Sequence, residues 1–274
     1  MKHTGLSVLM SLYKKELPEH LSTSLHSILA QTLLPDEIVI VLDGPITTAL
    51  QAVLDTFNQQ TNLIRLFPQP ENRGLGVSLA LGVKACHGPL IARMDTDDIM
   101  RNDRLALQYA KFQADLELGI CGSNIIEFDG NINHTVGQRR VPEDAESIRD
   151  FSRRRNPFNH MTVMFQKKAV LAAGNYQSQP GFEDYYLWAR MLANGVKGYN
   201  IQDNLVFART GAGMFARRGG WHYMIEGLKG RYAVYRAGLG RLTDFLFVSV
   251  VHIIVSLLPN RLRGWFYTTA IHAK

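Results

Sequence analysis

The chain has 274 residues, of which 46% are apolar and 20% charged, a composition that suits a folded protein with a sizeable core. Its two cysteines, Cys86 and Cys121, form no CxxC pair, which argues against a disulfide framework and a cysteine zinc cluster. Residues 1–213 carry 21 Lys/Arg against 22 Asp/Glu, whereas residues 214–274 carry 9 against 2. We therefore expect one large domain over 1–213 and a basic helical tail over 214–274.

Apolar runs and helical patterns alternate through the first hundred residues. The run at 6–12 lacks a following small-residue cleavage site, so we interpret it as a strand and not as a signal peptide. Further strands are predicted at 37–42, 63–67 and 89–95, and helices at 17–32, at 48–58 and after residue 72. Such alternation is typical of an α/β fold with a mostly parallel sheet.

Two of these strands end in an aspartate, Asp43 after "IVIVL" and Asp95 after "LIARM". In open α/β sheets, ligands bind beyond the carboxyl ends of the strands. We expect both acids to line one cleft.

The segment "RMDTDDIMRNDRL" places Asp95, Asp97 and Asp98 within four residues. Three carboxylates this close repel one another unless a cation relieves them, and Mg²⁺ or Mn²⁺ bridging to substrate phosphates would do so. The alternative is that Asp97 or Asp98 caps a following helix.

Later in the chain, a strand is predicted at 118–129, and a strand followed by a helix between 160 and 176. A further helix begins at Glu183-Asp184 and carries an apolar stripe at Leu187, Met191 and Leu192. Alternatively, the negative charges of these two acids could simply stabilise the helix through its dipole, which is positive at the N-terminus.

Taken in order, the segments "SVLMSLY", "SLHSILAQTLLPDEIVIVLDG", "ENRGLG", "IARMDTDDI", "NPFNHMTVMF" with "AAGNY", and "FEDYYLWARM" resemble glycosyltransferase family 2. The resemblance covers about residues 6–209 and implies an inverting enzyme of the GT-A fold, a Rossmann-like architecture. Within the family, the short bacterial members that assemble surface polysaccharides are the most similar.

The resemblance implies that Ser11, Tyr13 and Asp43 hold the nucleoside of a nucleotide-sugar. Asp95 would face ribose or metal as the first acid of a DxD motif, and Asp97 would bind the divalent ion. Asp98 is expected to be structural. Strand-end turn chemistry is the alternative role for the first three residues.

Two arginines could neutralise the donor's phosphates, Arg73 in "NRG" and Arg93 beside the strand end, because a guanidinium binds phosphate bidentately. Many members of the family carry Arg-Asn where this chain has Ala80 and Leu81. This difference weakens the phosphate contact expected of Arg73 and favours Arg93 for that role. Surface salt bridges would explain either arginine equally well.

By the same resemblance, Asp184 would be the general base that deprotonates an acceptor hydroxyl. His160 could be a third metal ligand or a substrate contact, although a lone histidine is often simply hydrogen-bonded. We also expect acceptor contacts from a set that could equally be solvated surface residues: Glu183, Arg209, Arg217 and Arg218.

The tail contains the apolar run "FLFVSVVHIIVSLLP" at 245–259, with Arg241 before it and Arg261 and Arg263 after it. This run is shorter than the roughly 20 residues needed to cross a bilayer, so we predict a monotopic or re-entrant membrane anchor. A helix packed on the core or on a partner chain is the alternative.

The sequence thus predicts a cytoplasmic enzyme on the cytosolic face of the inner membrane, with no role for nucleic acid. It would move one sugar from a nucleotide-diphosphate-sugar, UDP-linked by default, to a lipid-linked or oligosaccharide acceptor in surface polysaccharide synthesis. The rivals are a sugar nucleotidyltransferase, which would need a glycine-rich basic loop near the N-terminus, and a non-catalytic sugar-nucleotide-binding scaffold on the same fold.

Overall fold

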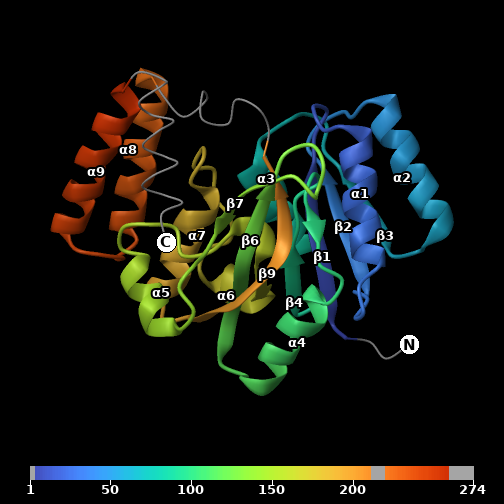
Figure 1. The fold of residues 1–274 in the computed structure, drawn as a ribbon, viewed down its shortest axis with the longest axis horizontal. Helices are drawn as coiled ribbons and strands as arrows, with labels where there is room; N and C mark the ends of the chain where they lie inside the picture. The colour runs from blue at the N-terminus through green and yellow to red at the C-terminus, as the bar shows by residue number, and fades with distance from the viewer. Residues whose placement is uncertain (1–3, 211–219, 259–274) are drawn as a thin grey trace.

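Four parallel strands and three helices form the first half of the fold, close to the elements predicted (Figure 1). The computed structural model describes residues 4–210 and 220–258. The strands are β1 (Leu6–Leu12), β2 (Glu37–Leu42), β3 (Ile64–Pro68) and β4 (Leu90–Arg93). The helices that connect them are α1 (Pro18–Leu29), α2 (Thr48–Gln60) and α3 (Leu75–Ala85).

The second half of the sheet is mixed, so the prediction of a mostly parallel sheet was wrong. Its strands are β5 (Ile99–Met100), β6 (Leu118–Phe128), β7 (Thr135–Arg139), β8 (Met164–Gln166) and β9 (Lys197–Arg209). The order is β3-β2-β1-β4-β8-β6-β9-β5, with β7 beside β6. Because β8 inserts antiparallel between β4 and β6, the regular crossover pattern ends at β4.

The remaining helices cover the second half of the sheet and one side of the molecule. They are α4 (Arg104–Ala114), α5 (Ala145–Phe151), the short 3₁₀ helix η1 (His160–Thr162), α6 (Lys167–Ala172), α7 (Glu183–Ala193), α8 (Trp221–Arg236) and α9 (Leu242–Leu257). The predicted domain boundary at 213/214 lies outside the described residues.

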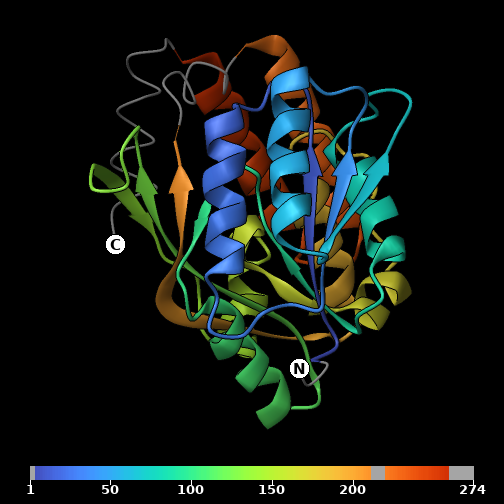
Figure 2. The same ribbon diagram turned by 90° about the vertical axis from the view of Figure 1, so that its right-hand side faces the viewer.

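The sheet lies between two apolar layers, because side chains on each strand alternate between its faces. Val8 and Met10 pack with α1 and α2, which cover the face turned to the viewer in Figure 2. Leu9 packs on the opposite face with α3 and α7. The strands are therefore buried on both sides, which leaves their carboxyl ends as the accessible edge.

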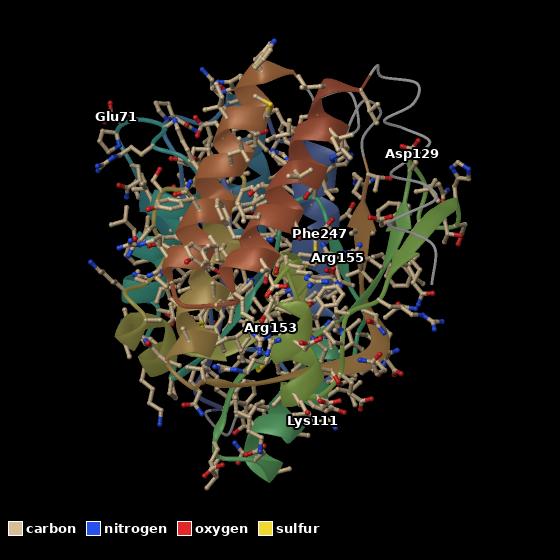
Figure 3. All side chains as sticks on the ribbon, turned by 90° about the vertical axis from the view of Figure 1, so that its left-hand side faces the viewer. Glu71, Lys111, Asp129, Arg153, Arg155 and Phe247 are labelled. Carbon is tan, nitrogen blue, oxygen red and sulfur yellow. The ribbon has the colours of Figure 1, made fainter. Side chains whose placement is uncertain are left out.

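The tail helices α8 and α9 stand side by side, and α8 packs against α7 (Figures 1 and 3). Gly230 of α8 lies against Phe182, where a methyl group on the glycine would come within 2.3 Å of the ring. At the other end of the contact, Arg154 pairs with Asp244 of α9 at 2.7 Å. Among the described residues, no helix combines the length and apolarity needed to cross a bilayer.

Candidate active site

A cleft of about 670 Å³ opens at the carboxyl ends of the parallel strands. As predicted, Asp43 and Asp95 both line it. Its walls also include three more of the residues nominated from the sequence: Ser11, Tyr13 and Asp97. The size suits a small-molecule ligand such as a nucleotide, since ligand pockets typically span about 300–1,000 Å³.

Asp43 organises the loop that forms one wall of this cleft. Its Oδ1 accepts a hydrogen bond from the Arg73 backbone N–H at 2.8 Å, and its Oδ2 accepts from the Asn72 side chain at 3.0 Å and the Gly74 N–H at 3.1 Å. The next residue, Gly44, has φ +83°, and a Cβ there would lie 2.6 Å from the Asn72 nitrogen. Asp43 thus performs the strand-end turn role, and its nucleoside contact stays a prediction.

Arg73 contributes its backbone to that loop, while its side chain is exposed and does not line the cleft. Arg93 is fully buried and forms an ion pair with Asp95. The phosphate contacts predicted for these two arginines therefore stay predictions. Of these two guanidinium groups, that of Arg93 is the one that contacts an acid of the cleft.

The acids after β4 do not cap a helix, because α4 begins only at Arg104. Asp98 is 2% exposed, and its Oδ1 accepts from the Arg209 backbone N–H at 2.8 Å, in the structural role expected of it. Burial, followed by the charges of Asp95 and Glu16, raises the pKa of Asp97 to about 7. Burial and its acidic neighbours also raise the pKa of Asp98.

Glu16 joins this acidic loop, although sequence analysis missed it. Its Oε2 accepts a hydrogen bond from the Thr96 hydroxyl at 2.7 Å, and it lines the cleft with Lys15 and His20. The only signal was its position just after β1, at the same sheet edge as the nominated acids. Glu16 lies 3.5 Å from His20 and Asp95 pairs with Arg93, which leaves Asp97 and Asp98 without an ion pair among the described residues.

This donor set fits a hard divalent cation. Asp95 and Asp97 offer carboxylate oxygens on the cleft wall, and the second oxygen of Asp98 has no hydrogen-bond partner in the described structure. Among the described residues, no group of three or more His, Cys, Asp or Glu could hold a metal ion by itself, so Asp95 and Asp97 would need substrate or water oxygens to complete a site. That pattern suits Mg²⁺ or Mn²⁺, which takes one or two carboxylates and completes its shell with phosphate and water.

His160 does not join the two aspartates in such a cluster. Its Nε2 lies 3.1 Å from the Tyr176 hydroxyl, and its ring packs against Trp188. Burial, followed by the charge of Arg93, lowers the pKa of His160 well below its ordinary value. Burial thus disfavours the protonated ring, and the observed role of His160 is the ordinary hydrogen-bonded one.

Asp184 is held at the start of α7 by a specific partner, Asn156. The Asn156 side-chain amide donates to Asp184 Oδ2 at 2.7 Å, and the backbone carbonyl of Asn156 accepts from Arg139 at 3.0 Å. Burial raises the pKa of Asp184, while a hydrogen bond from the Tyr185 backbone N–H, then the Asn156 bond and the charges of Arg139 and Arg93, oppose the rise. Asp184 is not the helix cap, because Phe182 occupies that position without a side-chain bond. Asn156 was missed as a functional residue, although it begins the quoted "NPFNH" segment.

Glu183 packs beside the loop wall of the cleft. A Cβ on Gly76 would lie 2.9 Å from Glu183 Cγ, so this glycine allows α3 and α7 to approach. Burial, followed by the charge of Asp184, raises the pKa of Glu183. The "NRGLG" and "FED" segments are thus brought together by a close contact that needs a glycine.

Of the three arginines predicted to contact an acceptor, the structure describes only Arg209. Arg209 supports the acidic loop: its Nε donates to the Asp97 carbonyl at 3.1 Å, its Nη1 donates to the Gly130 carbonyl at 2.9 Å, and its guanidinium stacks on Phe128. Its acceptor role stays a prediction. Arg217 and Arg218 lie outside the described residues.

Comparisons with known proteins agree with this architecture. The family model described as "Glycosyl transferase family 2" matches residues 7–173. The chain is 37% identical to the UDP-Gal:alpha-D-GlcNAc-diphosphoundecaprenol beta-1,3-galactosyltransferase of Escherichia coli, over 97% of this chain and 96% of that protein. It is also 37% identical to the amylovoran biosynthesis glycosyltransferase AmsE of Erwinia amylovora, over 95% of this chain and 97% of that protein.

Among solved structures, S. aureus TarS 1-349 in complex with UDP-GlcNAc has a TM-score of 0.67, with 14% sequence identity. The match covers 98% of this chain and 76% of that one, and at this identity it shows the shared GT-A-like fold. The family match and the two close relatives establish the class of enzyme. The chain belongs to glycosyl transferase family 2 and is a glycosyltransferase.

Proposed function

We propose that this enzyme transfers one sugar from a UDP-sugar to a hydroxyl of a lipid-linked diphosphate sugar, with inversion at the anomeric carbon. Two observations carry the proposal: an acid-lined cleft at the strand ends, and a half-buried carboxylate, Asp184, held by Asn156. The Escherichia coli relative, named for a UDP-Gal donor and a GlcNAc-diphosphoundecaprenol acceptor, supports this choice of substrates.

Asp184 supplies the base. Its carboxylate takes the proton of the acceptor hydroxyl while that oxygen attacks the anomeric carbon, and the bond from this carbon to the diphosphate breaks with its electron pair leaving on UDP. A positioned base of this kind typically contributes about 10²–10⁴-fold. The Asn156 side chain and the Tyr185 backbone N–H orient the carboxylate of Asp184, and we assign proton uptake to its Oδ1.

The acidic loop holds the donor's charged end. Asp95 and Asp97 are the residues that would hold a divalent ion, Mn²⁺ or Mg²⁺, which when bound offsets the charge that develops on the leaving diphosphate. Arg209 keeps the loop in place through the Asp97 carbonyl, and Arg93 orients Asp95 through their ion pair. Ser11, Tyr13 and Asp43 line the part of the cleft assigned to the nucleoside.

A lipid-linked acceptor lies in a membrane, so the enzyme must work at a membrane surface. We place it as a peripheral protein at the cytosolic face of the inner membrane, where nucleotide-sugars are available. The basic composition of the tail, 9 Lys/Arg against 2 Asp/Glu over 214–274, supports attraction to anionic lipid.

A transfer assay with Asp184→Asn tests the base assignment. The substrates are UDP-galactose, UDP-glucose or UDP-GlcNAc with a water-soluble alkyl diphosphate analogue of GlcNAc. The variant should lose turnover by roughly 10²-fold or more while UDP binding stays within a few-fold of wild type. Asp203→Asn, an exposed carboxylate paired with Arg101 outside the cleft, is the control and should turn over normally.

Wild-type turnover in Asp184→Asn would show that the base lies elsewhere. UDP binding by the wild type, without transfer to any acceptor, would instead favour the scaffold alternative.

A further inference from the structure

Helix α9 turns its apolar side outward and its polar side toward the protein. The outward side consists of residues between 49% and 57% exposed: Leu246, Phe247, Val250, Ile254 and Leu257. The buried residues of the helix are mostly polar: Asp244, Ser249, His252, Val255 and Ser256. A surface helix in water has the opposite arrangement, with its apolar stripe facing the core.

The outward residues form one continuous stripe. Spacings of four, four and three residues from Leu246 to Val250, Ile254 and Leu257 place them on the same side of the helix. The side of the molecule that carries α8 and α9 faces the viewer in Figure 3, and there the two helices lie in front of the sheet. In the described structure, no other element is seen to cover this stripe.

The contact between α8 and α9 resembles that between helices in lipid. Gly227 of α8 lies so close to His252 that a Cβ would come within 2.0 Å of its ring nitrogen, and the ring of Tyr223 packs beside it at 5.4 Å. Small residues that permit close approach, with serine and histidine turned inward, are typical of helix pairs whose surroundings are apolar.

Positive charge borders the stripe. The Arg154 guanidinium lies 5.3 Å from the centre of the Phe247 ring while it pairs with Asp244, and Arg241 at the start of α9 is exposed. Each acid of the described helix pair is engaged, Glu226 with Lys229 and Asp244 with Arg154. Since both acids have partners, the exposed Arg241 leaves net positive charge beside the stripe, which can meet lipid phosphates and which a second copy of this surface would repel.

We propose that the outward side of α9 is the surface that docks on an anionic lipid bilayer, with its apolar stripe among the upper acyl chains and its arginine border at the phosphates. The helix has 16 residues, so at 1.5 Å per residue it is about 24 Å long and lies in the plane of the interface instead of crossing it. This inference deepens the proposed function, from which it takes the location of the acceptor.

Docking in this orientation also sets the position of the catalytic base. Phe182, which packs against Gly230 of α8, immediately precedes Glu183 and Asp184. The guanidinium of Arg231 lies 5.8 Å from the centre of the same ring. The helix pair α8–α9 is therefore in direct contact with the start of α7, so docking of α9 on the bilayer would set how Asp184 meets an acceptor anchored in it.

Vesicle flotation of the full chain tests the surface. The test variant is Leu246→Gln/Val250→Gln/Ile254→Gln, which keeps good helix formers at exposed positions and so should fold normally. The control variant is Leu116→Gln/Val136→Gln/Leu171→Gln, which removes the same kinds of exposed apolar side chain outside α8 and α9. Both are compared with wild type on vesicles of phosphatidylethanolamine with phosphatidylglycerol and on vesicles of phosphatidylcholine alone.

We expect wild type and control to float with the phosphatidylglycerol vesicles, and the α9 variant to bind at least about tenfold more weakly because apolar burial in lipid is lost. The α9 variant should keep its transfer to the water-soluble acceptor analogue. Equal flotation of all three proteins would overturn the inference. So would a wild type that ignores vesicles but forms a dimer that the α9 variant loses, since the stripe would then be a subunit interface. If wild type floats but transfers no sugar, the proposed function fails and the surface assignment stands.

Discussion

Replacing Asn156 with alanine should change how Asp184 holds its proton. The Asn156 amide is the side-chain donor to Asp184, at 2.7 Å, and the Asn156 Oδ1 accepts from the Phe158 N–H, which fixes the orientation of the amide. The donor stabilises the ionised carboxylate more than the neutral acid. Its removal must therefore raise the pKa of Asp184 above its already raised value.

The size of the effect follows from the geometry. A buried hydrogen bond to a charged group contributes roughly 1.5–3 kcal/mol, and the same amide on a neutral acid contributes about 0.5–1.5 kcal/mol. The difference, about 1–1.5 kcal/mol, corresponds to about one pKa unit. Since the base must be deprotonated to act, activity rises with pH through this pKa, and the acid limb should move up by about one unit.

The assay is the pH profile of kcat and kcat/KM for wild type, Asn156→Ala and a control, Asn204→Ala. Asn204 accepts a side-chain hydrogen bond from Gln138 at 2.9 Å, a similar partly buried contact outside the active site. Only Asn156→Ala should shift the acid limb, whereas a merely structural loss would lower the melting temperature of either variant. An unshifted acid limb in Asn156→Ala, with a folded protein, would refute the role assigned to the hydrogen bond.

Three further changes test other parts of the site. Gly76→Ala should lower the free energy of unfolding by roughly 1–3 kcal/mol, measured by urea denaturation, because its Cβ would lie 2.9 Å from the Gln177 carbonyl oxygen. Metal-dependent UDP binding should weaken as pH falls below about 7, because Asp97 then takes up a proton; pH-independent affinity in calorimetry would contradict this. Glu16→Gln removes a charge that helps raise the pKa of Asp97, so the same binding transition should move to lower pH, and an unmoved transition would count against the coupling.

The first half of the fold was predictable because its signals are local. Strand patterns at β1, β2 and β4 are short apolar runs between helical repeats, and each occurs where it was expected. The mixed half was not predictable in the same way. Strand β9, at Lys197–Arg209, was missed because its partly exposed side chains break the apolar run, and its pairing with β6 is set by tertiary contacts.

The sequence predicted the acids that line the cleft but not the hydrogen-bond partners that hold the acids in place. Residues at strand ends, such as Asp43 and Asp95, could be found because their position in the fold brings them to one edge. The partners that tune the acids come from distant segments: Asn156 is 28 positions from Asp184, and Arg209 is 111 from Asp98. No spacing rule joins such pairs, so Arg209 was expected at an acceptor although its contacts support the acidic loop.

Calorimetric titration of UDP tests the assignment of the acidic cleft as the donor site most directly. The proteins are wild type, Asp97→Asn and a control, Asp103→Asn, whose carboxylate pairs with Arg101 outside the cleft. With Mn²⁺ or Mg²⁺ present, wild type and control should bind UDP, and both EDTA and Asp97→Asn should weaken binding at least about tenfold, as loss of a carboxylate ligand requires. UDP binding of equal strength in all three proteins, with or without EDTA, would contradict the assignment.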